Sequence, residues 1–329
     1  MKRLDTVTAV IPVHNRADLL ERLLATVKAQ TMPFAEVLAV DNGSTDGAAA
    51  VAAAYGCRVV PMGGNRGFAK AVNEGWRAAG TGWAAILNSD VELHPEWLER
   101  LLEGAGTAGF ATGLILRHGT ETVDGTYDLV SRGGCAWRAG HGAPPEAGGG
   151  VRRIGIAPAT ACIFRREVLE RLGGFDERYE SYLEDVDLGL RCVRAGIPGV
   201  YVPGAKAWHR GSATFGRWDG RVVRLISRNQ LKLVARHYDA GLFRECRWQI
   251  LAGQLLWGLV ALRHGAGRAW AAGKREGLRD FRPEGTPSEA LRRFLAESEA
   301  EIRGRTAERY WNWYFRLAGG TLRTAGGKP

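Results

Sequence analysis

The sequence predicts an α/β protein built on a largely parallel sheet and followed by a basic helical region. Between residues 7 and 87, short apolar runs alternate with segments of helical periodicity, the order typical of parallel strands covered by helices. Beyond residue 217, long helical patterns rich in arginine replace this alternation. We therefore expect a domain of residues 1–216 and a helical region of residues 217–329.

The first part of the expected domain has the clearest periodicity. In its first helix, Leu19, Leu23 and Val27 recur at the spacing of one helical face. The expected strands are apolar runs short enough for a buried parallel sheet, and they span residues 7–13, 36–40, 58–61 and 83–87. The expected helices between them span residues 18–30, 48–55 and 69–79.

The second part of the domain is less regular. A helix is expected within residues 91–103, after Pro95. Residues 117–153 are rich in glycine, proline and charge, and we expect a long flexible loop there that covers the site. The other expected elements are strands at 111–116, 159–165 and 200–202 and helices at 167–172 and 183–195.

The net charge of +10 is unevenly distributed along the chain. Residues 1–204 carry 21 basic and 24 acidic side chains, a net charge of −3, whereas residues 205–329 carry 24 and 11, a net charge of +13. This asymmetry favours an anionic partner: a membrane surface, a lipid diphosphate or nucleic acid. A solvated, arginine-rich helical surface is the plainer interpretation. Because the chain has no recognised nucleic-acid-binding motif, we do not expect nucleic acid as a partner.

Missing patterns exclude several classes of protein. No G-x-G-x-x-G follows the first strand and no G-x-x-x-x-G-K-[ST] occurs, which argues against dinucleotide and P-loop sites. Five scattered cysteines without a C-x-x-C pair predict reduced thiols. No apolar run reaches the roughly 20 residues of a membrane-spanning helix, and no signal-peptide core precedes the first strand. We therefore expect a cytoplasmic location.

Polar residues stand at the ends of the first two expected strands. Asp41 closes the second strand, next to Pro12, His14 and Asn15 of the first. Carboxyl ends of parallel strands meet at the edge of the sheet where ligands bind, so the Asp41 carboxylate can accept the ring N–H of a uracil or thymine base. A plain Asp-Asn-Gly turn is the alternative.

Asn65, Arg66 and Gly67 precede the third expected helix. Gly67 permits close backbone approach, and a helix N-terminus favours anions. Arg66 can pair with a phosphate or pack across a base, which predicts a contact with a nucleotide. An ordinary loop with an exposed arginine is the alternative.

Asn88, Ser89 and Asp90 follow the fourth expected strand. Hard divalent cations take oxygen ligands and usually keep substrate phosphates, so Asp90 is a candidate metal ligand. The same tripeptide is also a good turn or helix cap. His209, after the last expected strand, is either a second metal ligand or a structural histidine.

Glu184 and Asp185 begin an expected helix. Consecutive carboxylates point in different directions, so one can orient a substrate while the other acts as a base. The alternative is that both stabilise the helix dipole.

Taken in order, these segments resemble family 2 glycosyltransferases of the GT-A fold, and among them the bacterial rhamnosyltransferase-type enzymes. The resemblance covers about residues 6–235. Seven segments carry it: Val10–Arg16, Val40–Asp46, Asn65–Ala69, Leu87–Asp90, Gly173–Glu177, Glu184–Leu188 with Arg191, and His209.

The resemblance implies a role for each site residue. Asp185 would be the catalytic base, supported by Glu184, and Asp90 with His209 would hold a divalent metal, Mn²⁺ or Mg²⁺. The nucleotide-sugar half would comprise about residues 1–116 and the acceptor half about residues 117–216. The residues implied to bind the donor substrate are Pro12, His14, Asn15, Asp41, Asn65, Arg66, Gly67, Asn88 and Ser89.

The resemblance also implies an activity. An inverting glycosyltransferase would move a sugar from a nucleotide-diphosphate donor to a hydroxyl of a glycan or lipid-linked acceptor in cell-surface polysaccharide synthesis. Rhamnose from dTDP-rhamnose is the leading candidate. The usual D-x-D has an asparagine, Asn88, at its first position here. A catalytically weak or inactive nucleotide-sugar-binding module is therefore the alternative.

The C-terminal region suggests where the acceptor lies. Alternating apolar and arginine positions, as in residues 242–244 and 248–263, predict an amphipathic segment in the plane of an anionic leaflet. We therefore expect a peripheral protein at the inner face of the cell membrane. The aromatic residues 310–315 predict a membrane anchor, an acceptor platform or the seam of a homo-oligomer, and packing in a helical core is the alternative.

Overall fold

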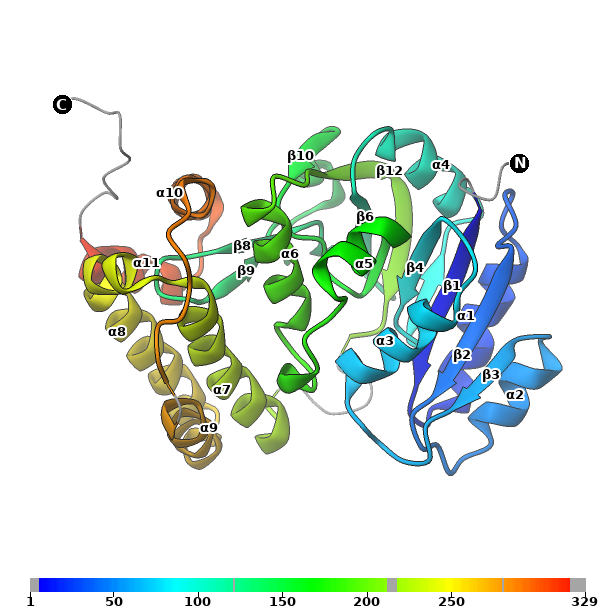
Figure 1. The fold of residues 1–329 in the computed structure, drawn as a ribbon, viewed down its shortest axis with the longest axis horizontal. Helices are drawn as coiled ribbons and strands as arrows, with labels where there is room; N and C mark the ends of the chain where they lie inside the picture. Colours follow the sequence, from blue (N-terminus) through cyan, green and yellow to red (C-terminus); the bar gives the residue numbers. More distant parts are fainter. Residues whose placement is uncertain (1–5, 121, 212–217, 280, 320–329) are drawn as a thin grey trace. The chain divides into compact units, whose positions relative to one another are not determined.

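The computed structural model describes residues 6–120, 122–211, 218–279 and 281–319. The chain divides into two compact units (Figure 1). The first, which we call the sheet unit, comprises Met1–Tyr127, Arg138–Cys192 and Ile197–Thr214. The second, the helical unit, comprises Asp128–Trp137, Val193–Gly196 and Phe215–Pro329. Two short segments within the expected first domain thus belong to the helical unit, and the expected boundary at 216–217 lies outside the described residues.

The sheet unit is built on a mixed, mostly parallel sheet in the order β10-β12-β6-β11-β4-β1-β2-β3. The strands in that path are β1 Val7–Val13, β2 Glu36–Asp41, β3 Arg58–Pro61, β4 Trp83–Leu87, β6 Phe110–Arg117, β10 Arg152–Ile154, β11 Ala161–Arg165 and β12 Gly199–His209. Two short strands join from the side: β5 Val91–Leu93 pairs with β12, and β7 Val123–Gly125 pairs with β6. The predicted α/β class with a mostly parallel sheet is confirmed.

The direction of the strands brings many loops to one edge. Strands β1 to β4 are mutually parallel, and β6 is parallel to β12. Because β11 is antiparallel to both β4 and β6, β6 and β12 run in the same direction as β4. The carboxyl ends of β1, β2, β4 and β12 therefore lie at the same edge, the usual ligand-binding edge of such a sheet.

Helices cover both faces of this sheet. One core packs alternate strand residues such as Val7, Ala9 and Ile11 against α1 Ala17–Lys28, α2 Ala48–Ala54 and α4 Trp97–Ala105. On the other face, α3 Phe68–Ala78 lies close to β1 and β2, where a Cβ on Gly75 would meet Val10 and Val40. The remaining helices of this unit are α5 Arg166–Leu172 and α6 Glu184–Arg194, of which the last two residues fall in the helical unit.

The helix expected after Pro95 is present as α4, and it is preceded by β5, because Val91–Leu93 pairs with the end of β12. The expectation for residues 117–153 was wrong. Residues 117–153 are not one long loop: in the described part they form β7, β8 Asp128–Val130, β9 Ala136–Arg138, a 3₁₀ turn and β10. The segment is ordered because it has buried side chains, such as Tyr127 in the sheet unit and Leu129 in the helical unit. The strand expected at 200–202 is longer and continues to His209.

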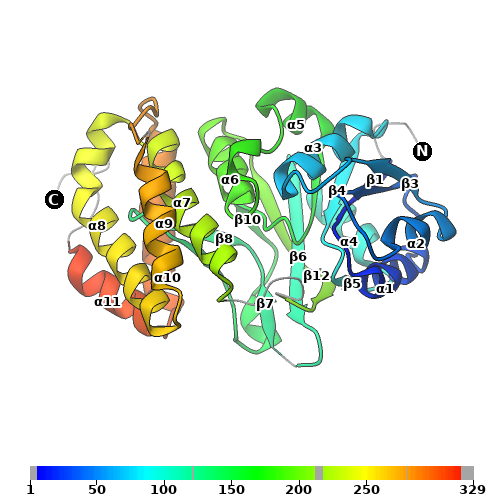
Figure 2. The same ribbon diagram turned by 90° about the horizontal axis from the view of Figure 1, so that it is seen from below.

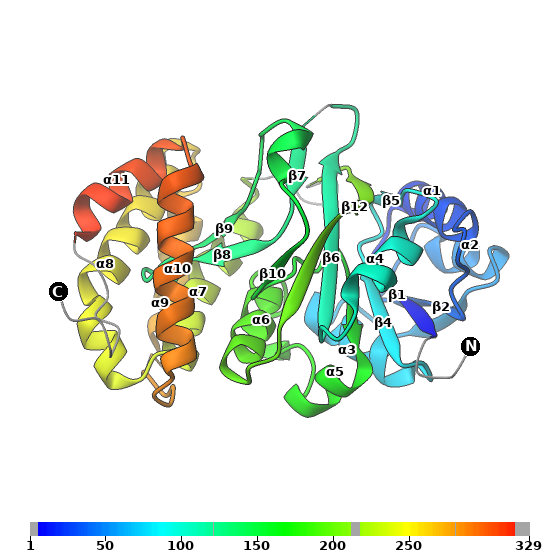
Figure 3. The ribbon, with the colours of Figure 1, turned by 90° about the horizontal axis from the view of Figure 1, so that it is seen from above.

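The helical unit contains α7 Gly220–His237, α8 Ala240–Arg263, α9 Gly267–Arg279, α10 Glu289–Arg305 and α11 Arg309–Ala318 (Figures 2 and 3). The turn between β8 and β9 is tied to α10 by a buried ion pair, with 2.5 Å between Arg132 Nε and Glu299 Oε2. Tyr314 of α11 donates to the same carboxylate over 2.6 Å. Of the helices described, none is both long and apolar enough to cross a membrane.

Candidate active site

A buried histidine joins two carboxylates at the ligand-binding edge of the sheet. His209 ends β12, and its Nε2 lies 3.3 Å from Asp90 Oδ1 while its Nδ1 lies 2.8 Å from Asp124 Oδ2. The pairing of β5 with β12 sets the first contact. Val91 is the register partner of His209, and Arg210 N donates to Asp90 O over 3.1 Å. Asp90 and His209, the two predicted metal ligands, are far apart in the sequence but lie side by side in the structure.

The charges of this cluster reinforce one another. Burial lowers the pKa of His209, but hydrogen bonds to Asp124 and Asp90, together with their negative charges, raise it to about 9. Burial opposes ionisation of Asp124, yet the hydrogen bond with His209 and the charge of Arg138 bring the pKa of Asp124 down to about 2. Asp124 is therefore an ionised buried carboxylate that orients the imidazole ring.

Sequence reasoning missed Asp124. It lies in the segment expected to be a loop, and a lone Val-Asp-Gly offers no signal of its spatial neighbours. The structure holds it in β7, where His141 Nδ1 lies 2.8 Å from the Asp124 carbonyl oxygen and Arg138 Nη1 lies 3.9 Å from its carboxylate. Only the pairing of β7 with β6 brings this carboxylate to the histidine.

Asp90 and His209 offer atoms of the kinds that bind divalent cations, a carboxylate oxygen and an imidazole nitrogen. Among the described residues, no group of three or more His, Cys, Asp and Glu side chains converges as a metal site. Asp90 and His209 would supply one oxygen and one nitrogen ligand, and Asp124 holds the other ring nitrogen as carboxylates commonly do behind metal-bound histidines. The Oδ1 atom of Asn88, two residues before Asp90, is buried and has no hydrogen-bond partner among the described residues, so it would be a candidate for a further oxygen ligand. Substrate phosphates and water would complete such a coordination sphere.

The two adjacent carboxylates of α6 differ sharply in exposure. Glu184 is only 5% exposed, and within the described part of the chain its Oε2 has no hydrogen-bond partner. Burial, followed by the neighbouring charge of Asp185, raises the pKa of Glu184 well above its usual range. Asp185 is half-buried, and its carboxylate accepts from Ala159 N over 3.0 Å and from Val186 N over 2.8 Å. Glu184 is therefore the buried carboxyl group whose ionisation is disfavoured, and Asp185 is the less buried acid, oriented by two backbone amides.

The start of β11 links this acid to the loop after β4. Asn88 N donates to Thr160 O over 2.9 Å, and the next residue back, Ala159, donates to Asp185. Ser89 and Asp90 continue from Asn88 and are half-buried. The predicted metal ligands and the predicted base thus share one anchor on the same edge of the sheet.

The ends of β1 and β2 form a tight polar corner. Asp41 Oδ1 accepts from Ser44 N over 2.9 Å, and His14 Nδ1 lies 3.1 Å from Asn42 O. Asn15 has a left-handed backbone with φ of 61°, and its side chain accepts from Thr45 N over 2.8 Å. The turn interpretation and the base-recognition hypothesis for Asp41 are therefore compatible, since one oxygen shapes the turn. Pro12 is buried inside β1.

Asn42, which was not among the predicted site residues, organises the loop before α3. It is buried, and its side chain accepts from Arg66 N over 2.7 Å and donates to Gly67 O and Asn65 Oδ1, both over 3.3 Å. The Arg66 side chain lines a cavity of about 410 Å³ between the end of β3 and α3, whose lining residues are Val60, Pro61, Met62, Arg66, Lys70 and Glu74.

The N-terminus of α3 is already occupied by protein. Phe68 N donates to Ser181 Oγ over 3.3 Å, and Ala69 N donates to Glu180 O over 3.0 Å. Gly67 has a φ of 90°, and a Cβ there would lie 2.9 Å from Glu180 O. The close approach expected at Gly67 is made by this loop, so these amides are not available to an anion, contrary to our prediction.

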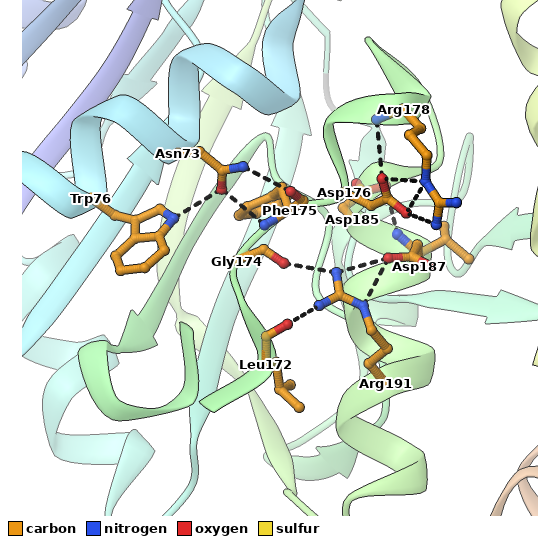
Figure 4. Close-up of polar contacts among 11 residues, drawn as sticks. Asn73, Trp76, Leu172, Gly174, Phe175, Asp176, Arg178, Asp185, Asp187 and Arg191 are labelled. Carbon is orange, nitrogen blue, oxygen red and sulfur yellow. Dashed lines mark hydrogen bonds and ion pairs between the residues drawn. The ribbon is translucent and has the colours of Figure 1, made fainter. Parts of the chain in front are cut away.

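Polar contacts hold the segment before α6 in place (Figure 4). Arg191 forms an ion pair with Asp187 over 2.7 Å and donates to the carbonyl oxygens of Leu172 and Gly174. The Asn73 side chain of α3 donates to Phe175 O over 2.7 Å and accepts from Phe175 N over 2.9 Å. These contacts hold the start of α6, and with it Asp185, against α3.

Comparison with known proteins identifies the family of this chain. The family model of glycosyl transferase family 2 matches residues 8–173, and that of glycosyl transferase family group 2 matches residues 155–270. An N-acetylglucosaminyl-diphospho-decaprenol L-rhamnosyltransferase of Mycobacterium tuberculosis is 32% identical over 246 residues, which cover 65% of this chain and 78% of the relative.

Two solved structures share the fold. The mannosyltransferase of Pyrobaculum calidifontis in complex with GDP-Man and Mn²⁺ aligns with a TM-score of 0.52 and 18% identity, covering 94% of this chain and 82% of that one. GalNAc-T7 with UDP, GalNAc and Mn²⁺ aligns with a TM-score of 0.60 and 16% identity, covering 77% of this chain and 51% of that one. At these identities the likeness concerns the fold.

The contact between Gly67 and Glu180 generates a stability prediction. Gly67→Ala should destabilise the protein by about 3 kcal/mol or more, because its backbone conformation is nearly restricted to glycine and the new Cβ meets a backbone oxygen. Gly47→Ala is the control, since Gly47 has a φ of 87° with open space around it, and it should cost about 1–2 kcal/mol. Denaturant unfolding measures both. Equal losses would contradict a close contact at Gly67.

Proposed function

The chain belongs to glycosyl transferase family 2, and on that premise we propose an inverting transfer of rhamnose from dTDP-rhamnose to a hydroxyl of a glycan or lipid-linked acceptor. That it is a glycosyltransferase of the GT-A fold follows from the family and from the structural neighbours. The donor and the acceptor class rest on the similar mycobacterial enzyme, whose name gives rhamnose and a diphospho-decaprenol acceptor. A role in cell-surface polysaccharide synthesis is part of the same proposal.

One observation carries the proposed chemistry: an oriented, half-exposed carboxylate at the edge that also holds Asp90 and His209. Two backbone amides hold Asp185, one on each oxygen, and each oxygen keeps a lone pair for another donor. In the proposed step this carboxylate takes the proton of the acceptor hydroxyl while that oxygen attacks the anomeric carbon. The bond from the anomeric carbon to the diphosphate oxygen breaks, the nucleoside diphosphate leaves with that electron pair, and the configuration inverts.

Glu184 would support this base through its environment. Two adjacent ionised carboxylates would repel each other in a partly buried site, and the deeper one is the more costly to ionise. Burial, followed by the charge of Asp185, raises the pKa of Glu184, so its neutral form would add no second charge beside the base. The less buried, oriented Asp185 is therefore the proposed proton acceptor.

Asp90 and His209 would hold the divalent cation, Mn²⁺ or Mg²⁺, with Asp124 behind the histidine. When bound, such a cation acts as a Lewis acid and template for the departing diphosphate. Asp124 keeps His209 Nδ1 engaged, so Nε2 is the nitrogen directed toward Asp90. Asn88 provides a neutral oxygen where the family's usual pattern has a carboxylate.

The polar corner of His14, Asn15 and Asp41 would receive the nucleoside. Asp41 keeps one oxygen beyond its turn contact for the base N–H. Arg66, with its side chain in the cavity beside α3, would meet phosphate or base. Asn65 and Gly67 accept hydrogen bonds from the Asn42 side chain, and these bonds would set the shape of the loop. Ser89 lies between Asn88 and Asp90 in the sequence.

A second candidate function is a nucleotide-sugar-binding module without efficient turnover. Asn88 favours it, because a neutral amide is a weaker metal ligand than a carboxylate. A peripheral location at the cytoplasmic face of the membrane and self-association are further parts of our proposal. The exposed face of the C-terminal helices supports the first of these.

The base assignment predicts a clear difference between two adjacent substitutions. Asp185→Asn should lower kcat by about 10²–10⁴, the usual contribution of general-base catalysis, with donor affinity unchanged. Glu184→Gln, the matched control, should retain most activity because glutamine resembles the neutral acid. Release of nucleoside diphosphate with an acceptor present, and donor binding by calorimetry, measure the two quantities. Near-normal turnover of Asp185→Asn, or an equal loss in both variants, would contradict the assignment.

Metal binding should depend on Asp124 although this residue is not a ligand. Asp124→Asn should weaken the affinity for Mn²⁺ about 10- to 100-fold, because His209 loses the charge that orients it. Electron paramagnetic resonance of free Mn²⁺ measures this without donor or turnover. Asp176→Asn removes a carboxylate that pairs with Arg178 instead, and it should leave Mn²⁺ affinity unchanged.

The donor proposal predicts a ranking of nucleotide sugars. With Mn²⁺ present, dTDP-rhamnose should raise the melting temperature more than UDP-glucose, UDP-galactose or GDP-mannose do. Mn²⁺ should increase the shift, because cation and diphosphate would bind together. A larger shift with one of the other sugars would refute rhamnose, whereas binding of dTDP-rhamnose without transfer or hydrolysis would favour the non-catalytic module.

A further inference from the structure

Helix α8 leaves a stripe of large apolar side chains exposed. Its solvent-facing side carries Trp248, Leu251, Leu255, Leu259 and Leu262, each between 47% and 61% exposed. Its buried side carries Leu242 and Ile250 together with small and polar residues: Cys246, Gln249, Gly253, Gln254, Gly258 and Ala261. A surface helix normally turns its apolar stripe toward the core.

The buried side of α8 is committed to contacts inside the helical unit. Gln254 Nε2 donates to Gly133 O over 2.7 Å, and its Oε1 accepts from Lys274 Nζ. Gln249 Nε2 donates to Ala318 O over 2.8 Å. Rotating the helix to bury its leucines would break these bonds and leave buried polar atoms without partners. The apolar side is therefore directed outward by the fold itself.

The exposed residues form one continuous stripe. Successive members are three or four residues apart, the spacing that keeps side chains on one helical face. From Trp248 to Leu262 the stripe extends about 21 Å along the axis at 1.5 Å per residue. That length is shorter than the roughly 30 Å hydrocarbon core of a bilayer, so the helix suits an orientation in the membrane plane.

Arginines surround this stripe. Arg244 and Arg247 are exposed near its N-terminal end and Arg263 at its C-terminal end. The Arg247 guanidinium lies over the Trp248 ring, 5.6 Å from its centroid. Tryptophan and arginine together are typical of the interfacial zone of a membrane, where the ring enters the headgroup region and the cation meets lipid phosphate.

Helix α11, which packs on α8 through a hydrogen bond from Tyr310 Oη to Gly253 O, shows the same combination. Its Trp313 and Leu317 are exposed, and Arg316 lies over the Trp313 ring at 5.3 Å. Trp311 and Tyr314 of this helix are buried. The aromatic cluster thus divides between core packing and an exposed surface.

We propose that the exposed stripe of α8 (Trp248, Leu251, Leu255, Leu259 and Leu262) docks in the plane of an anionic phospholipid membrane. The leucines enter the acyl-chain boundary while the flanking arginines bind lipid phosphate. A second copy of the chain is a poorer occupant, because a symmetric contact would bring the arginines of both copies together. This surface is where the peripheral membrane location of the proposed function would be realised. The docking proposal rests on the proposed function only for its biological role, not for its structural argument.

Vesicle flotation tests the proposal with the full-length protein. The wild-type chain should float with vesicles of phosphatidylglycerol and phosphatidylcholine, and high salt or pure phosphatidylcholine should weaken this binding. Leu255→Gln/Leu259→Gln should reduce partitioning at least about tenfold, because two apolar side chains leave the acyl-chain boundary. Val151→Gln, at an exposed apolar residue of the sheet unit, is the control and should bind as wild type.

Two further measurements keep membrane docking and catalysis separate. The α8 variant should retain the wild-type melting temperature and donor affinity, whereas Asp185→Asn should float like wild type. Undiminished flotation of the α8 variant, or equal binding of the wild type to neutral vesicles, would overturn the proposal. Light scattering gives a further outcome against the proposal. If the wild type is a dimer, and the α8 substitutions convert it to a monomer that still floats with vesicles, the stripe is a dimer interface and not a membrane-docking surface.

Discussion

The shared direction of β1, β2, β4, β6 and β12 is the constraint on which the site depends. Parallel strands end at one edge, so residues from distant parts of the sequence converge there without any long loop. Strands β4 and β12 are not neighbours in the sheet, since β11 and β6 lie between them. The chain crosses this distance directly after β4: the short strand β5 follows β4 in sequence and pairs with β12 on the side away from β6, which brings Asp90 to His209.

The loops at this edge are stiff because their polar groups bind one another. Asn42 holds the backbone of Arg66 and Gly67, and Glu180 and Ser181 occupy the first amides of α3. On the far side of the same loop, Asp187 and Arg191 fix the beginning of α6. A ligand at this edge therefore meets side chains of set orientation, and little conformational entropy remains to be lost on binding.

The site residues that the sequence could predict are those that stand at the ends of strands. Asp41, Asp90 and His209 follow apolar runs, and periodicity alone placed them at one edge. Asp124 was out of reach because β7 has three residues and its partner strand is set by tertiary pairing. For Gly67 the sequence indicated a close approach but could not identify the approaching group, which comes from residue 180. The opposite roles of Glu184 and Asp185 likewise depend on burial, which two adjacent acids in a sequence do not reveal.

Helix α8 is a second case in which the sequence does not show which side chains are buried. Its exposed leucines recur three or four residues apart, the spacing of one helical face, but this spacing does not show whether that face lies inside or outside. In the helical unit, Lys274 and the carbonyl oxygens of Gly133 and Ala318 have Gln249 and Gln254 as partners. Turning the leucines inward would leave these polar groups unpaired at about 1–3 kcal/mol each, whereas leucines beside lipid would keep apolar surroundings. An outward apolar face is then a stable arrangement wherever the surface it meets is itself apolar.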